Sequence, residues 1–145
     1  MNVLLDTCVI SELIRPRPAA PVISWLESIY EEHLYLSVVT LGELCKGIMC
    51  LDQNTRKARR LQEWLDHDLA QRFQGRILPV DSSVALEWGR LCSAAEQSGR
   101  PRPVIDCLLA ATARVHGLTL ATRNTTDFAD TGVAVFNPWQ DGGNG

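Results

Sequence analysis

The chain has 145 residues, of which 46% are hydrophobic and 21% are charged, a composition typical of one globular domain and unlike that of a disordered segment. Its 14 basic and 17 acidic residues give a net charge of −3, so the overall charge does not indicate a nucleic-acid-binding protein. No apolar run approaches the roughly 20 residues of a transmembrane helix. The first residues lack the basic region of a signal peptide. The five cysteines follow no zinc-finger spacing, so we expect free thiols, a cytoplasmic location and no membrane association.

The first half of the chain alternates short apolar strands with helices. An apolar run over residues 2–5 predicts a buried parallel strand that ends at Asp6. The elements predicted after it are a helix over 9–15, a helix over 21–32, a strand over 34–37, a helix over 40–51 and a long charged helix from 54 to about 73.

The second half continues the alternation. The predicted elements are a strand over 77–80, a helix over 82–97 capped by Asp81, a loop over 98–103, a helix over 104–116 ended by Gly117, and strands over 118–121 and 133–136. Strands that alternate with helices indicate an α/β sandwich with a mainly parallel sheet. We expect one domain over 1–137 and a flexible C-terminal tail over 138–145.

Acidic side chains follow the predicted strands or begin the predicted helices. Asp6 ends the first strand, Glu43 lies early in the helix after the second, Asp106 lies in the first turn of its helix, and Asn124 and Asp127 follow a later strand. Taken singly, Glu43 and Asp106 could complement a helix dipole, and Asp127 could cap a turn. Asp6 differs, because a carboxylate directly after an apolar strand is costly to bury without a partner. In parallel sheets, ligands gather at the carboxyl ends of the strands.

A group of carboxylates favours a bound cation, because like charges a few ångströms apart repel strongly. Oxygen-only ligands suit Mg²⁺ or Mn²⁺ rather than zinc. Such an ion lowers the pKa of a bound water and polarises a phosphoryl oxygen. Phosphodiester hydrolysis is the reaction that this chemistry serves best.

The motifs that hold these acids resemble those of PIN-domain nucleases. The matching segments are residues 4–13 (LLDTCVISEL), 37–44 (SVVTLGEL), 106–113 (DCLLAATA), 119–128 (TLATRNTTDF) and 133–139 (VAVFNPW). They occur in the family's order and span nearly the whole chain. The last of them is similar to the FitB-like branch of VapC toxins.

The resemblance implies a three-layer α/β/α PIN-like sandwich with a mainly parallel central sheet. It also implies a Mg²⁺- or Mn²⁺-dependent endoribonuclease, the toxin of a type II toxin–antitoxin system, which forms homodimers, cleaves RNA and is blocked by a cognate antitoxin. The family's acidic quartet falls on Asp6, Glu43 and Asp106, with the fourth catalytic and metal-binding position at Asp127 or Asn124. Both assignments of the fourth position remain open from the sequence, and Asp127 is the carboxylate of the two.

Four further residues match positions that support the acids in the family. They are Thr7, Cys8, Thr122 and Asn124. Cys8 stands where the family usually has asparagine, and a thiol is a weaker hydrogen-bond partner than an amide. The difference affects a contact to the site and leaves the acidic ligand set itself intact.

Arginines near the motifs are candidates for phosphate contact, because a guanidinium binds phosphate oxygens in pairs. They are Arg15, Arg100, Arg102 and Arg123. A second basic cluster, residues 56–60, is equally consistent with a solvated helix face.

Other classes of protein fit the sequence less well. Haloacid-dehalogenase-type phosphatases have an acid two residues after the first aspartate, where this chain has Cys8. A receiver domain has a lysine after its last strand, and no lysine follows Lys57. The alternative that remains is a catalytically degenerate PIN-like module that only binds RNA or protein.

The net charge does not oppose an RNA substrate: setting aside Asp6, Glu43, Asp106 and Asp127 leaves 13 acidic residues against 14 basic ones.

Overall fold

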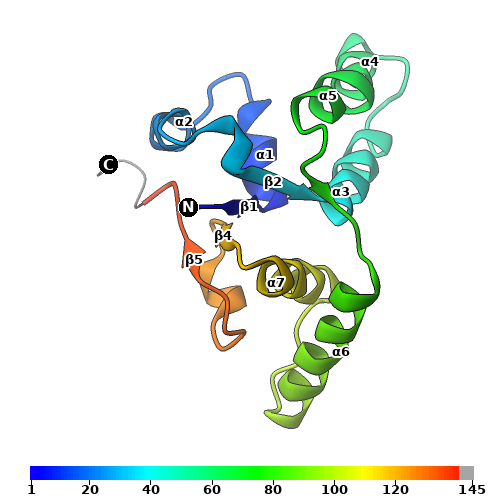
Figure 1. The fold of residues 1–145 in the computed structure, drawn as a ribbon. Helices are drawn as coiled ribbons and strands as arrows, with labels where there is room; N and C mark the ends of the chain where they lie inside the picture. Colours follow the sequence, from blue (N-terminus) through cyan, green and yellow to red (C-terminus); the bar gives the residue numbers. More distant parts are fainter. Residues whose placement is uncertain (141–145) are drawn as a thin grey trace.

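The computed structural model describes residues 1–140, whose strands form one parallel five-stranded sheet (Figure 1). The order across the sheet is β3-β2-β1-β4-β5. The strands are β1 (Val3–Leu5), β2 (Leu34–Ser37), β3 (Ile77–Leu78), β4 (Thr119–Ala121) and β5 (Val135–Phe136). Since β1 pairs with both β2 and β4, the first strand of the chain lies at the centre of the sheet.

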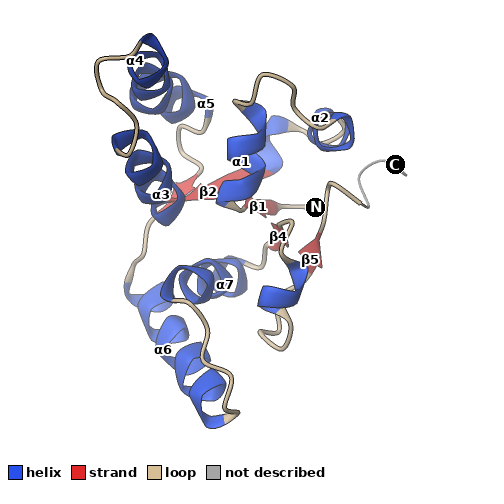
Figure 2. Cartoon of the chain, turned by 180° about the vertical axis from the view of Figure 1, so that it is seen from behind, coloured by secondary structure: helices blue, strands red, loops and turns tan. Residues whose placement is uncertain are grey.

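Helices cover both faces of this sheet, so the predicted α/β/α sandwich is confirmed (Figures 1 and 2). One face carries α1 (Thr7–Leu13), α2 (Ala20–Glu27), α3 (Val38–Met49), α4 (Arg56–Glu63) and α5 (Ala70–Arg72). The opposite face carries α6 (Ser82–Gln97) and α7 (Val104–His116). Short 3₁₀ turns occur at Glu31–His33 and Thr125–Phe128. Within residues 1–140, no helix is long and apolar enough to cross a membrane.

The pleat of β1 divides the hydrophobic core between the two faces. Val3 and Leu5 pack with the helices that precede β3, while Leu4 packs with α7. All three side chains have no exposed surface, as the alternation of strand side chains requires when both faces are covered. The short apolar run at the N-terminus therefore connects both layers of helices.

Most predicted elements are present, with changed boundaries. Asp81 caps α6 by accepting from the Val84 amide at 3.0 Å, and Gly117 ends α7 with φ of 65°. The predicted helix over 21–32 stops at Glu27, where the Ser28 hydroxyl bonds to the Trp25 carbonyl at 2.6 Å and competes with the helical backbone. The strand predicted over 77–80 ends before Pro79, which has no amide to donate.

The long helix predicted from 54 to about 73 is continuous but not uniform. A π-helical segment, Trp64–Leu69, lies between α4 and α5. Leu65 and Leu69 within it are buried in the core, so the wider turn redirects apolar side chains towards the sheet.

The predicted C-terminal tail over 138–145 begins with residues that contact the domain. Pro138 is buried, and Trp139 packs against the core that holds α2. The Trp139 amide donates to Asn137 Oδ1 at 2.9 Å. The rest of the predicted tail, residues 141–145, lies outside the described residues.

A buried acid joins α1 to α2. Glu12 is 5% exposed, and its carboxylate accepts from the Ala19 amide at 2.9 Å and from the Arg15 guanidinium at 3.1 Å. Burial alone would raise the pKa of Glu12, but these two donors hold it below the ordinary value of 4.5. Ionised Glu12 therefore stabilises the fold above that value, and this contribution is lost as the pH falls below it.

We predict that Glu12→Ala lowers the free energy of unfolding by about 1–3 kcal/mol, because it leaves the Ala19 amide without its acceptor. Glu12→Gln keeps an acceptor oxygen and should lose less. Urea unfolding at pH 7 measures both variants, and a wild-type midpoint for Glu12→Ala would contradict the assignment. The difference between wild type and Glu12→Gln should narrow as the pH falls below 4.5.

Candidate functional site

The candidate site lies where the strand order reverses. From β1 the chain builds outward to β2 and β3 on one side, and later to β4 and β5 on the other. The loops after β1 and β4 therefore leave the sheet side by side, the position at which open α/β sheets bind ligands. The Asp6 amide donates to the Ala121 carbonyl at 3.0 Å, which holds Asp6 and Thr122 next to each other across 116 residues of chain.

The Asp6 carboxylate is fixed from two sides. Its Oδ1 accepts from the Thr7 amide at 2.7 Å, so the side chain caps α1. Its Oδ2 accepts from the Thr122 hydroxyl, also at 2.7 Å. Asp6 is 8% exposed and Thr122 is fully buried. These donors satisfy the acid that the sequence places after the apolar strand, and they hold it in one orientation.

Glu43, half-buried on α3, is tied to the same place through Thr7. The Thr7 hydroxyl donates to Glu43 Oε1 at 2.5 Å and lies 3.2 Å from the hydroxyl of Thr40. Thr40 is fully buried and is not among the site residues predicted from the sequence. Its signal was available, since it lies three residues before Glu43 and therefore on the same face of the helix.

Asp106 lies in the first turn of α7, and the other three acids affect its pKa. Burial, followed by the carboxylates of Asp127, Asp6 and Glu43, raises its pKa from 3.8 to about 6, while Arg102 acts in the opposite direction. The four acids predicted from separate segments of the sequence therefore face one electrostatic environment. Asp127 itself is exposed, and among the other carboxylates it acts on Asp106 most strongly.

Cys8 and Asn124 contact the site through weaker interactions. Cys8 Sγ lies 3.7 Å from Asp6 Oδ2, and burial and the Asp6 charge raise the pKa of the thiol to about 11. The thiol is therefore a protonated donor, and it also accepts from the Arg123 amide at 3.5 Å. The Asn124 amide donates to the Thr122 hydroxyl at 3.1 Å, so its backbone orders the group that holds Asp6.

The carboxylates form an open group and not a cage that would enclose a metal ion. Their oxygen atoms are the type of ligand that a hard divalent cation prefers. Within residues 1–140, no three Asp, Glu, His or Cys side chains converge as a ready-made set of metal ligands. Mg²⁺ is usually held by one or two carboxylates and several waters, so a coupled but open group of acids suits it. Burial is the largest cause of the raised pKa of Asp106, and the charges of Asp127, Asp6 and Glu43 add to it, so negative charge from three other segments acts at this edge.

The predicted arginines differ in their surroundings. Arg102 donates to the carbonyls of Asp127 and Ala129, and Arg100 lies 3.7 Å from Asp130. The Arg123 guanidinium lies 5.0 Å from the centre of the Trp139 ring, a cation–π contact.

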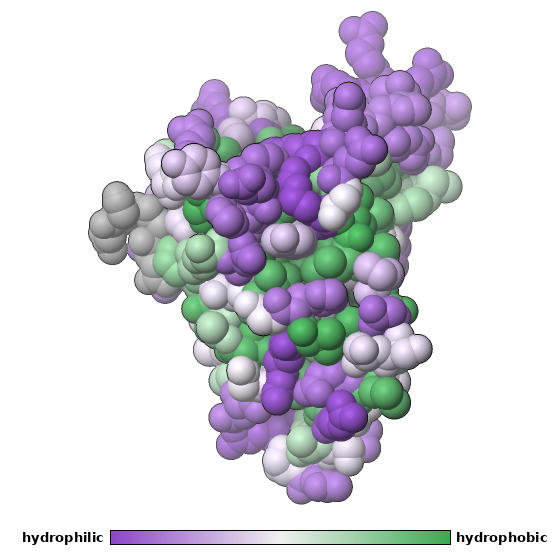
Figure 3. Space-filling model, in the orientation of Figure 1, coloured by the Kyte–Doolittle hydropathy of each residue, from purple (hydrophilic) through white to green (hydrophobic). Residues whose placement is uncertain are grey.

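Arg15 is not near the acids: it pairs with Glu12 and lines a groove of about 860 Å³ between α1 and α4. The basic residues of α4 lie on this side, where Figure 3 shows the most hydrophilic surface of that view.

Known proteins resemble this chain in both sequence and structure. The PIN domain family profile matches residues 3–134. Toxin FitB of Neisseria gonorrhoeae is 45% identical over 139 residues, which cover 96% of this chain and 99% of that protein. The VapC ribonuclease Y4jK of Sinorhizobium fredii is 35% identical, over 95% of this chain and 98% of that protein. The crystal structure of FitAcB from Neisseria gonorrhoeae superposes with a TM-score of 0.88 at 44% identity, covering 95% of this chain and 99% of that one.

We predict that Asp106→Asn stabilises the metal-free protein at pH 8 and has a smaller effect at pH 4. A carboxyl whose pKa is raised on folding, here from 3.8 to about 6, costs stability once it must ionise, and that cost vanishes at low pH. Urea unfolding in EDTA at both pH values measures the difference. Asp68→Asn, at an exposed aspartate that does not act on Asp106, is the matched control. An equal effect of Asp106→Asn at both pH values would contradict the coupling.

Proposed function

The chain belongs to the PIN-domain family, among the FitB and VapC proteins, and on that premise we propose that it is a Mg²⁺- or Mn²⁺-dependent endoribonuclease that hydrolyses RNA phosphodiester bonds. The observation that carries the proposal is the hydrogen-bonded group in which Thr7 contacts both Asp6 and Glu43 and Thr122 holds Asp6, and these acids also act on Asp106. A relative named as a VapC ribonuclease supports the same reaction.

In this proposal the ion is held by Asp6, Glu43, Asp106 and Asp127. Asp127 takes the fourth acidic position, because its charge acts on Asp106, while Asn124 offers a neutral amide. When bound, Mg²⁺ or Mn²⁺ supplies an activated water and a positive charge beside the phosphate. The acids would hold the ion in position. Its positive charge would in turn reduce the repulsion between them.

The neutral residues around the acids fix their orientation. Thr122 and the Thr7 amide hold the two oxygens of Asp6, and the Thr7 hydroxyl holds Glu43. Because these donors are in place before substrate arrives, little reorganisation is needed during the reaction. Cys8 adds one longer contact to Asp6.

We extend the proposal to the setting of the reaction. A 45% identical relative is named a toxin, and an RNase in the cytoplasm that degrades its own cell's RNA requires a resident inhibitor. The protein is therefore proposed as the toxin of a type II toxin–antitoxin pair, a homodimer with a cognate antitoxin partner. A basic side chain of the antitoxin would compete with the metal for the acids.

A second function, a PIN-like module that binds RNA or protein without cleaving it, is favoured by one observation. Within residues 1–140 the acids do not converge as a complete set of metal ligands. Calorimetric titration of the metal-free protein with Mn²⁺ separates the two functions. The nuclease binds Mn²⁺ with a stoichiometry that Asp106→Asn reduces, whereas a degenerate module shows no saturable heat.

We predict that Asp6→Asn abolishes RNA cleavage while the fold survives. Asparagine keeps one acceptor oxygen, which can serve the Thr7 amide, and its NH₂ can donate to the Thr122 hydroxyl, but it removes the charge that attracts the cation. Sequencing of RNA ends after induced expression, with wild type and Asp6→Asn side by side, measures cleavage. Full activity of a purified, metal-saturated Asp6→Asn protein would contradict the proposal, and Asp68→Asn should cleave normally.

We also predict that Thr122→Val weakens Mn²⁺ binding by roughly tenfold or more, because partners that orient metal-binding carboxylates contribute on this scale. Thr122→Ser keeps the hydroxyl that donates to Asp6 and should bind as wild type does. Isothermal calorimetry of the two variants provides the comparison. Equal affinities would show that the Thr122 hydroxyl does not support the metal site.

A further inference from the structure

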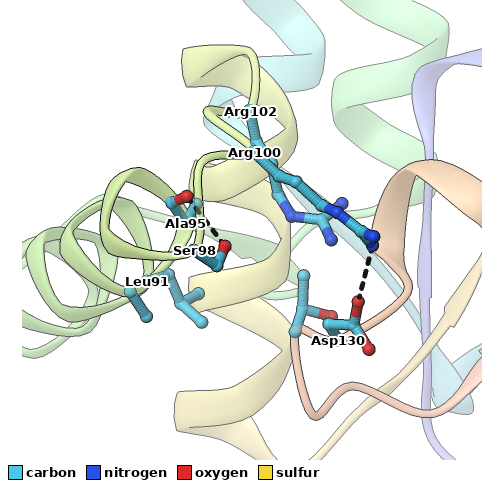
Figure 4. Close-up of a pocket in the computed structure, with 8 residues that line it drawn as sticks. Leu91, Ala95, Ser98, Arg100, Arg102 and Asp130 are labelled. Carbon is cyan, nitrogen blue, oxygen red and sulfur yellow. Dashed lines mark hydrogen bonds and ion pairs between the residues drawn. The ribbon is translucent and has the colours of Figure 1, made fainter.

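A cavity of about 360 Å³ opens between the C-terminal half of α6, the loop before α7 and the loop after β4 (Figure 4). Its wall on α6 is made of small or apolar side chains, Leu91, Ala94 and Ala95. Its polar lining residues are Ser98, Arg100, Arg102, Asp130 and Thr131. An apolar wall with a few polar groups at one end is the usual form of a small-molecule site.

The two arginines of this cavity have different bonding. Arg102 donates to the carbonyls of Asp127 and Ala129, so its guanidinium is engaged in holding the loop after β4. Arg100 pairs with Asp130 at 3.7 Å, and the two side chains are 77% and 76% exposed. Exposed pairs of this kind contribute little stability. A phosphate can therefore replace Asp130 as the partner of Arg100 at low cost.

The cavity adjoins the loop that carries one of the four acids, Asp127. A second cavity of about 240 Å³ shares Arg100, Arg102 and Asp130 with the first and extends to Asp127 and Pro103. Pro103 immediately precedes α7, whose first turn carries Asp106. A polynucleotide with its phosphate at the acids would thus pass the mouth of the cavity, where Figure 4 shows Arg100 and Asp130 facing each other.

Ser98 gives the cavity a hydrogen-bonding preference. Its hydroxyl donates to the Ala95 carbonyl at 2.9 Å, so its oxygen faces a ligand as an acceptor. The Thr131 hydroxyl is already engaged, because it donates to the Phe128 carbonyl at 2.6 Å and lies 3.4 Å from the Val133 amide. The cavity therefore offers an acceptor oxygen to a ligand that carries an N–H group.

We propose that this cavity is a nucleotide-binding subsite, which takes one unpaired base of the RNA beside the carboxylate site. The base lies against Leu91, Ala94 and Ala95, its N–H edge faces Ser98, and its phosphate replaces Asp130 on Arg100. The assignment of the ligand as RNA rests on the proposed nuclease function. The subsite would set which nucleotide is accepted next to the cleaved bond.

Binding of mononucleotides tests the subsite without requiring cleavage. The four 5′-ribonucleoside monophosphates and inorganic phosphate are titrated separately into the ¹⁵N-labelled protein in EDTA, and amide shifts are followed by NMR. We expect saturable shifts at Ala94, Ser98, Arg100 and Thr131, and an affinity that depends on the base and exceeds that of phosphate.

Three variants locate the binding. Arg100→Ala should weaken it about tenfold by removing a charge-assisted bond. Ala94→Trp fills the cavity from an exposed helix position and should block base-dependent binding while the spectrum stays folded. The control variant Arg90→Ala removes an exposed, ion-paired arginine that lies on α6 outside the cavity, and it should bind as wild type does.

Equal affinities for phosphate and all four nucleotides would overturn the subsite, as would unchanged binding by Ala94→Trp or shifts confined to other parts of the protein. These outcomes are separate from the failure of the proposed function. Base-dependent binding in the cavity by a protein that cleaves no RNA would contradict the nuclease and leave the subsite in place.

Discussion

Repulsion between carboxylates gathered at one edge of a parallel sheet is the constraint on which the site depends. Asp6, Glu43, Asp106 and Asp127 come from four segments, and burial together with the charges of the other three acids raises the pKa of Asp106 to about 6. That arrangement costs free energy in the metal-free protein. A fold that maintains such a cost needs strong local anchors, and the divalent cation that we propose for this site would relieve the cost.

The anchors are backbone pairing and neutral donors rather than opposite charges. The central position of β1 fixes Asp6, and the threonines after β1 and β4 fix the carboxylates of Asp6 and Glu43. On the other side, Arg102 and Arg114 hold the loop that carries Asp127 through its carbonyls, with Arg114 donating to the Thr131 carbonyl at 2.8 Å. These arginines position the loop through its carbonyls, and the charge of Arg102 also offsets part of the repulsion at Asp106.

The sequence predicts the elements that carry this site well, because local chemistry decides them. The strand–helix alternation predicts the parallel sheet, and the role of the acids at its edge stays a prediction. The sequence predicts less where the answer lies in tertiary contacts. The bond from Arg102 to the Asp127 carbonyl and the Glu12 link between α1 and α2 each join groups whose proximity no periodicity indicates. The π-helical segment was not predicted from the sequence for the same reason, because it depends on tertiary packing.

The carboxyl carbon of Asp106, followed by NMR over a pH titration of ¹³C-labelled protein, tests the central claim most directly. We expect Asp106 to titrate with a midpoint of about 6 in EDTA. We also expect a shift towards the ordinary value of 3.8 when Asp6 and Asp127 are both replaced by asparagine, and a similar fall when Mg²⁺ is added. An Asp106 that titrates near 3.8 in the metal-free wild type, and is unmoved by either change, would contradict the account.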